Sequence, residues 1–292
     1  MSNLKNDSPL IDPLPQKFNF FATVHKSILS ADFYRNVRYF SPVTALKFVL
    51  QMCLLTALIS GAAYTYYAFD DQRGLPAIVP EVFPGMSLKN GLLDPGRSTP
   101  FAPEKAYSVK MLNMLFCMPG VFDVLPDSFI VVDTSLGALE KHSIAQLIVS
   151  DRFFALKTKQ STSMKIAYSK LFPGPDTIAF TRTGMDKLLR KNRLNMFINF
   201  FIQTGIITAG ALCVSIIFLT FAAFIFRIEK REKVGCYFKK ACFAVSPIFI
   251  GNNLIAASGS HIPNTWYLLL MIAVFVMFRG IRATHTAGEQ RS

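Results

Sequence analysis

The chain has 292 residues, of which 51% are hydrophobic, and its mean hydropathy is +0.35. Soluble domains are usually less apolar than this, so the composition favours a membrane protein. The formal net charge of +13 does not require a nucleic acid, because no nucleic-acid-binding motif accompanies it and basic residues are attracted to anionic lipid near a membrane.

The chain before the first apolar run divides into two parts. Residues 1–17 hold three prolines and show little periodicity, which predicts a disordered cytoplasmic tail. Residues 18–45 are aromatic and basic, and we expect them to lie in the headgroup region, with Ser30 capping a short helix. Together they are too long for the n-region of a signal peptide, so the apolar run after Pro42 is expected to be an uncleaved anchor.

Four apolar segments predict transmembrane helices, because about 20 helical residues cross the hydrocarbon core of a bilayer. They are residues 46–69, 195–226, 241–258 and 262–278. The last two are short and polar-edged, which leaves a tilted or re-entrant arrangement open for them. Pro247 is expected to kink the third segment.

The basic residues alternate along these segments. They are frequent before the first segment, in the loop 227–240 and in the tail 279–292, whereas the turn 259–261 has none. Lys and Arg near spans tend to stay cytoplasmic. The pattern predicts a multi-pass protein of a plasma membrane with both termini in the cytoplasm and residues 70–194 outside.

The pattern in residues 70–194 is typical of a small α+β domain. Prolines recur between Pro76 and Pro103, which forbids a long helix and favours short extended pieces. Asn90-Gly91 is typical of a hairpin turn, and apolar spacing favours a helix over 104–117. The predicted strands are 129–134, 143–150, 152–158 and 164–172. We therefore expect an α-helical membrane protein with four transmembrane helices and an α+β extracytoplasmic domain inserted between the first and second helix.

The exit from this domain is basic. Thr183 with Asp186 resembles a capping box, and the helix is expected to continue into the second span without a break until Gly205. Four basic residues then lie just above the outer membrane–water interface: Lys187, Arg190, Lys191 and Arg193. Two interpretations remain, contact with outer-leaflet phosphates and binding of an anionic envelope ligand.

Several strings resemble the uncharacterised bacterial polytopic membrane-protein family catalogued as domain of unknown function 1189. They are residues 33–50 (FYRNVRYFSPVTALKFVL), residues 75–93 (LPAIVPEVFPGMSLKNGLL), FIVVDTS at 129–135, the Tyr168-Ser169 region and the helix start at Thr183. The resemblance would cover about residues 30–280 in order and spacing. It implies the membrane architecture described above and brings no reaction, cofactor or catalytic residue.

FIVVDTS is also the most enzyme-like string of the chain. An aspartic-protease interpretation of Asp133 requires a second carboxylate, and a phosphoryl-acceptor interpretation requires a second aspartate where Ser135 stands. The third interpretation is that Asp133 and Thr134 cap the strand end through side chain–backbone hydrogen bonds. No histidine has a second ligand at metal-binding spacing. We expect no catalytic residue, metal or cofactor, and retain Asp133 and Thr134 as binding candidates.

The polar residues of the spans point to helix packing. No Asp, Glu, Lys, Arg or His lies in the interior of the predicted spans, which disfavours a coupled transporter. Gln203, Asn252 and Asn253 are expected to bond between helices, although the adjacent pair 252–253 also suits a polar lumen. Gly205 and Ala209 offer a small-residue contact.

These patterns predict function only coarsely. We expect no enzyme but an envelope binding, sensing or scaffolding protein that acts through its extracytoplasmic domain. Its expected partners are the lipid bilayer and an envelope protein or ligand on the outer face, without nucleic acid. The alternatives are an accessory subunit or small permease for lipid or solute, and a membrane hydrolase that uses Asp133.

Overall fold

The computed structural model describes residues 19–117, 121–135, 137–142, 146–157, 163–171, 177–225, 233–258 and 265–289. The predictions for residues 1–17 and for the turn 259–261 lie outside these residues. The chain forms two compact units. The first comprises Met1–Thr56, Ile207–Leu254 and Asn264–Ser292, and the second comprises Ala57–Ile206 with Ile255–Pro263.

Within the described residues, four helices are long and apolar enough to cross a membrane. They are α3 (Pro42–Ala68), α9 (Arg193–Ile225), the pair α10 (Val234–Ala244) and α11 (Ser246–Ser258), and α12 (Thr265–Glu289) up to Arg282. Exposed apolar side chains recur along α3 every three or four residues, at Val43, Leu46, Leu50, Leu54 and Leu58. Such a stripe suits contact with lipid tails, and the predicted four-span class is confirmed.

The third span begins earlier than predicted. Because it starts at Val234 rather than residue 241, Lys239 and Lys240 lie within the helix and are 9% and 0% exposed. The prediction that the interior of the spans holds no Asp, Glu, Lys, Arg or His is therefore wrong for this helix. The helix breaks at Val245, just before Pro247, as the predicted kink requires.

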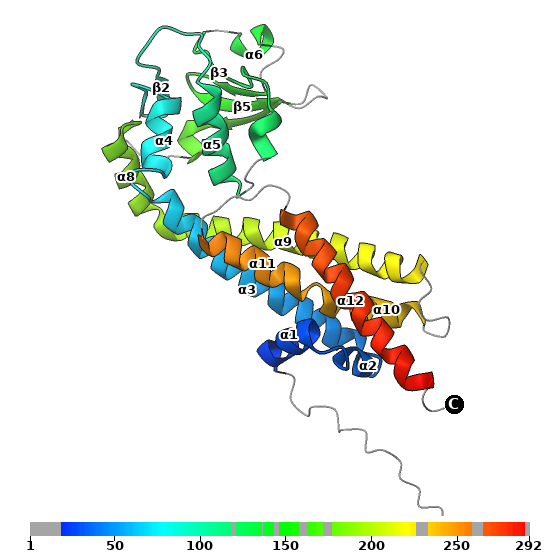
Figure 1. Cartoon of the computed structure of the whole chain (residues 1–292). Helices are drawn as coiled ribbons and strands as arrows, with labels where there is room; N and C mark the ends of the chain where they lie inside the picture. Colours follow the sequence, from blue (N-terminus) through cyan, green and yellow to red (C-terminus); the bar gives the residue numbers. More distant parts are fainter. Residues whose placement is uncertain are drawn as a thin grey trace, which may run out of the picture. The chain divides into compact units, whose positions relative to one another are not determined.

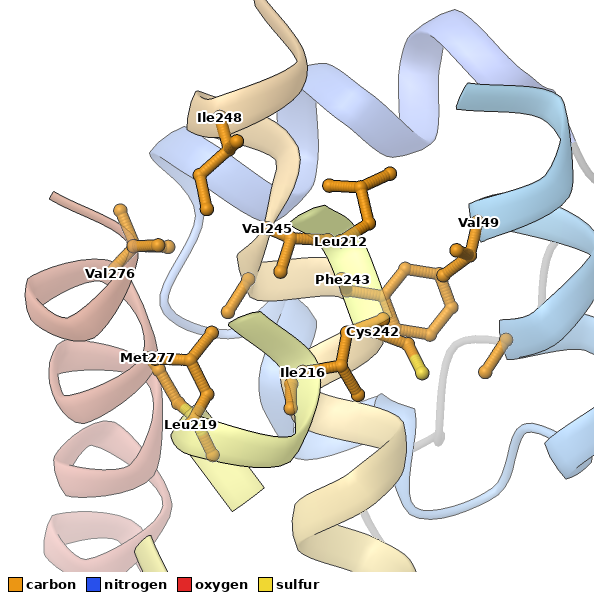
Figure 2. Close-up of a cluster of buried hydrophobic side chains, with 14 of the residues drawn as sticks. Val49, Leu212, Ile216, Leu219, Cys242, Phe243, Val245, Ile248, Val276 and Met277 are labelled. Carbon is orange, nitrogen blue, oxygen red and sulfur yellow. The ribbon is translucent and has the colours of Figure 1, made fainter. Parts of the chain in front are cut away.

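Two short helices precede the first span, α1 (Phe20–Leu29) and α2 (Phe33–Val37). The Ser30 hydroxyl accepts a hydrogen bond from the Phe33 N–H at 3.3 Å, as predicted, but α2 begins at Phe33 rather than Ala31, and Asp32 is its N-cap. The two helices contribute buried Val24, Tyr34 and Val37 to the core of the first unit, and their expected headgroup position stays a prediction. Figure 2 shows part of this core, to which several helices contribute side chains, among them Leu212, Phe243 and Met277.

Side chains of the spans bind the carboxyl ends of these short helices, where backbone carbonyls lack partners within the helix. The Arg279 guanidinium donates to the Ile28 carbonyl at 2.9 Å. The Lys239 ammonium donates to the carbonyls of Arg38 at 2.6 Å and Phe40 at 2.9 Å. A buried lysine is thus satisfied by the end of α2.

The second unit holds an α+β region between α3 and α9 (Figure 1). Its helices are α4 (Leu75–Val82), α5 (Lys105–Leu115), the 3₁₀ turn η1 (Val121–Val124), α6 (Ala138–Lys141), α7 (Tyr168–Leu171) and α8 (Arg182–Lys191). Its strands are β1 (Ser87–Lys89), β2 (Leu92–Asp94), β3 (Ile130–Val132), β4 (Leu147–Val149), β5 (Phe153–Lys157), β6 (Ser163–Ala167) and β7 (Ile178–Ala179). This confirms the predicted class.

The described strands form two sheets. The order in the smaller is β2-β1-β7, with all neighbours antiparallel. The order in the larger is β3-β4-β5-β6, in which β3 and β4 are parallel and the other neighbours antiparallel. Ile130 and Ile148 are buried in the larger sheet, so the string FIVV is the core strand that its β-branched residues predicted.

In the proline-rich opening of the domain, one prediction from the sequence is correct and another is wrong. Asn90 and Gly91 have φ angles of 54° and 73° between β1 and β2, which is the predicted hairpin turn. The predicted extended piece before it is instead α4. Pro76 stands in its first turn, where no N–H donor is needed, and Ile78 and Val82 bury one face despite Pro80.

The exit helix also differs from its prediction. The Thr181 hydroxyl, rather than Thr183, caps α8 by accepting from the Gly184 N–H at 3.2 Å. The helix then stops at Lys191 instead of running to Gly205. The Asn192 amide donates to the Leu188 carbonyl at 2.9 Å, and this side chain–backbone bond accompanies the break before α9.

We predict that Lys239→Met destabilises the protein although methionine keeps the apolar stem. Without the ammonium, the carbonyls of Arg38 and Phe40 lose their donor in a buried place, at an expected cost of about 1–3 kcal/mol. Thermal unfolding in detergent measures the change. Lys233→Met is the matched control, because Lys233 is exposed. Equal melting temperatures for the two variants would contradict the capping role.

Candidate functional site

Asp133 follows β3 directly and is 1% exposed. Its Oδ1 accepts from the Ser135 N–H at 2.9 Å, and its Oδ2 lies 2.8 Å from His142 Nε2. Gly137, with a φ of 80°, starts the short helix α6, which leads the chain back so that His142 meets the carboxylate. Both oxygens of Asp133 are therefore occupied by protein groups at the strand end.

The electrostatics of Asp133 favour its charged form. Burial by itself raises the pKa of the carboxyl, but the hydrogen bonds from Ser135 and His142 outweigh burial, and the pKa is lowered. The neighbouring Thr134 hydroxyl lies 3.0 Å from that of Thr99. This is the geometry of a strand-end cap, the third of the interpretations made from the sequence. Sequence spacing did not reveal His142, because the turn at Gly137 and α6 creates the contact.

A second site lies where α5 ends. With its amide oriented so that each group faces its complement, Gln203 on α9 donates its nitrogen to the carbonyls of Leu115 at 3.1 Å and Phe116 at 3.3 Å, and its oxygen accepts from Asn199 at 2.9 Å. The Tyr64 hydroxyl, on α3, lies 3.5 Å from the Cys117 carbonyl. We call this set of contacts the α5 joint. Two spanning helices thus hold the carboxyl end of one domain helix.

The helices that carry the α5 joint pack closely. A side chain at Gly61 would place its Cβ 3.0 Å from the Phe201 Cα, so glycine permits the approach of α3 to α9. The Thr204 hydroxyl donates to the carbonyl of its own helix at Phe200 and reaches that of Ala57 at 3.3 Å. A Cβ at Gly205 would lie in ordinary contact with Ala57, in line with the expected small-residue contact.

The other predicted bundle amides behave differently from each other. The Asn253 amide donates to the Thr56 hydroxyl at 3.0 Å and to the Phe249 carbonyl at 2.7 Å, which is the predicted bond between helices. The half-buried Asn252 makes no hydrogen bond through its side chain to another described residue. Gln203, expected to join spans, binds the α5 joint instead.

A third site is a groove of about 980 Å³ at the domain-side ends of α3 and α9. We call it the interfacial groove. It is lined by Ala62, Thr65, Tyr66, Phe69, Asp70, Asp71, Gln72, Arg190, Lys191, Arg193, Leu194 and Phe197. Three of the four basic residues singled out from the sequence therefore come together here, whereas Lys187 is not part of the lining.

The charged side chains of the interfacial groove have defined contacts. Arg190 donates its Nε to both oxygens of Asp186 at 2.8 Å, and this carboxylate raises the pKa of the guanidinium. The Arg193 guanidinium lies 5.9 Å from the ring centre of Phe69. Asp70 Oδ1 accepts from the N–H groups of Gln72 and Arg73, and these bonds lower the pKa of Asp70.

Among the described residues, no three His, Cys, Asp or Glu side chains are grouped as metal ligands would be. No family model, curated protein or solved structure matches the chain. The resemblance to the family of unknown function rests on the strings quoted for it alone. The function has to be inferred from the Asp133 cap, the α5 joint and the interfacial groove.

We predict that Asp133→Asn lowers stability by about 1–3 kcal/mol at neutral pH, because the buried His142 contact loses its charged acceptor. The lowered pKa of Asp133 contributes stability that is present above the pKa of the unfolded chain, about 3.9, and is lost as the pH falls through the folded value. The free energy of unfolding, measured from pH 7 to pH 3, should therefore fall less in Asp133→Asn than in the wild type.

Asp127→Asn is the control for this prediction. The Asp127 side chain is 91% exposed and forms a surface ion pair with Lys105, so its loss should change stability by less than about 0.5 kcal/mol. If Asp133→Asn has the stability and acid response of wild type, the carboxylate is not a structural cap.

Proposed function

We propose that the chain is a non-enzymatic binding protein of the bacterial plasma membrane. In this proposal the α+β domain lies on the outer face and binds an envelope protein or ligand, while both termini lie in the cytoplasm. The spans anchor the domain and respond to its state. The observation that carries the proposal is the α5 joint, in which Tyr64 and Gln203 bind the end of a domain helix.

The α5 joint supports coupling because helix-end carbonyls need donors. Gln203 supplies two hydrogen bonds and Tyr64 a longer third one, and their helices touch at Gly61. A displacement of α5 therefore either moves the ends of α3 and α9 or breaks these hydrogen bonds. A ligand that changes the position of α5 has a direct mechanical path into the spans.

The alternatives receive less support from the contacts. A permease is expected to use intramembrane charge for its substrate, but the Lys239 ammonium already donates to two carbonyls. A hydrolase that uses Asp133 needs a carboxylate oxygen that reaches substrate, and both oxygens of Asp133 accept from protein groups. The resemblance to the family of unknown function supports a proposed membership of that family, but it brings no enzymatic reaction with it.

The orientation is tested by reporter fusions to the full membrane-spanning chain. We expect a reporter inserted after residue 160 to be active outside the membrane, and reporters after residue 230 and at the carboxyl terminus to be active inside. A reporter after residue 230 that is active outside contradicts the proposed topology.

We predict that Gln203→Leu uncouples α5 from the spans. Hydrogen–deuterium exchange of the full-length protein in nanodiscs should become faster at the end of α5 and over the domain-side ends of α3 and α9, because only the longer Tyr64 contact remains. The strands of the larger sheet should keep their protection. The control is Gln51→Leu, since the buried side-chain oxygen of Gln51 has no partner.

The two variants separate coupling from general loss of stability. Faster exchange throughout the domain in Gln203→Leu means that the glutamine only supports folding. Unchanged exchange at the ends of α3 and α9 contradicts the proposal that the spans respond to α5.

A further inference from the structure

The interfacial groove lies where two spans leave their apolar stretch. It is lined by Tyr66 in the last turn of α3, by Phe69 just after that helix, and by Leu194 and Phe197 in the first two turns of α9. Aromatic side chains concentrate at this depth of a membrane, where apolar tails give way to polar headgroups. A molecule in the groove therefore meets both environments at once, whichever side of the membrane the domain occupies.

The apolar part of the groove is open to a partner. Tyr66 is 72% exposed and Leu194 is 69% exposed, and both belong to the lining. Acyl chains that follow α3 and α9 would cover these side chains at the place where a headgroup meets the polar rim. A soluble anion has no apolar part to cover Tyr66 and Leu194, so the lining favours an amphiphile.

The rim of the groove carries both signs of charge. Arg190, Lys191 and Arg193 are basic, while Asp70 and Asp71 are acidic. Asp186 already neutralises Arg190, and Asp70 is engaged by the backbone of its own turn. Arg193 and the exposed Asp71, whose charge also acts on Arg190, are the pair best able to meet a ligand.

Their chemistry selects the headgroup. A guanidinium such as that of Arg193, above the Phe69 ring, presents a planar set of donors that matches a phosphate. A purely anionic headgroup leaves Asp71 opposed to like charge, and a quaternary ammonium cannot donate a hydrogen bond to it. A phosphate joined to a primary amine satisfies both residues.

We propose that the interfacial groove binds a phospholipid of the surrounding bilayer that has a primary-amine headgroup, as in phosphatidylethanolamine. The phosphate binds at Arg193, the ammonium binds at Asp71, and the acyl chains cover Tyr66 and Leu194. This places a specific lipid site at the junction of domain and membrane, independently of any ligand of the domain.

The test is native mass spectrometry of the full-length protein released from detergent. Phosphatidylethanolamine, phosphatidylglycerol and phosphatidylcholine with identical acyl chains are added at equal concentration. We expect the ethanolamine lipid to be retained best. Arg193→Gln should lower its retention about tenfold through loss of a charge-assisted contact, and Asp71→Asn should lower its preference over the glycerol lipid.

Arg182→Gln is the matched control, because Arg182 is an exposed arginine of α8 that does not line the groove. It should retain lipid as wild type does, and all variants should melt at the wild-type temperature. If Arg193→Gln melts early, Arg193→Lys replaces it, with intermediate retention expected because the charge stays and the planar fork is lost.

Three outcomes overturn the proposal. Equal retention of the ethanolamine and choline lipids, or equal effects of Arg193→Gln and Arg182→Gln, means that only annular lipid is seen. Tightest retention of the glycerol lipid without effect of Asp71→Asn assigns the groove to anionic lipid instead. Glycerophosphoethanolamine lacks acyl chains and should displace little lipid, so full displacement by it means that the groove recognises a free headgroup.

Discussion

The structure depends on one constraint, that backbone carbonyls at helix ends need donors even where water is scarce. Within the described residues, short helices end against spanning helices in three places, and at each a side chain of a span supplies the donor. Arg279 does so for α1, Lys239 for α2, and Gln203 with Tyr64 for α5. These four polar residues of an otherwise apolar bundle are thereby explained by the elements that dock on it.

Because of this constraint, polar side chains within the spans of this chain do not by themselves indicate a transport path. Charged and amide groups in spans commonly mark a transport path. Here the ammonium of Lys239 is directed to the end of α2, and the amide of Asn253 joins α11 to α3 through Thr56. The polar groups hold elements together, which suits a protein whose role is to position a domain rather than to conduct a substrate.

Hydropathy and turn chemistry predicted the four spans, the Asn90-Gly91 hairpin and the β3 strand, because these depend on local pattern. Tertiary contacts decided the rest. Burial stabilises α4 despite its prolines, and Lys239 joins a helix because α2 offers acceptors. The α5 joint could not be predicted, since nothing local links Gln203 to Phe116. The sequence did show a glutamine, Gln203, in an apolar helix. This indicated that its amide has a hydrogen-bonding partner but did not identify that partner.

The α5 joint and the interfacial groove use the same ends of α3 from different sides. Tyr64 reaches the joint and Tyr66 lines the groove, and two residues along a helix are about 200° apart around its axis. On α9, Gln203 and Phe197 are six residues apart, which places them about 120° apart around the helix axis. A lipid that fixes one face of these helix ends therefore restricts the movement that α5 imposes on the other. Under these two proposals, a domain ligand that shifts α5 changes the affinity for the lipid by the factor by which the lipid changes the affinity for that ligand, because linkage is reciprocal.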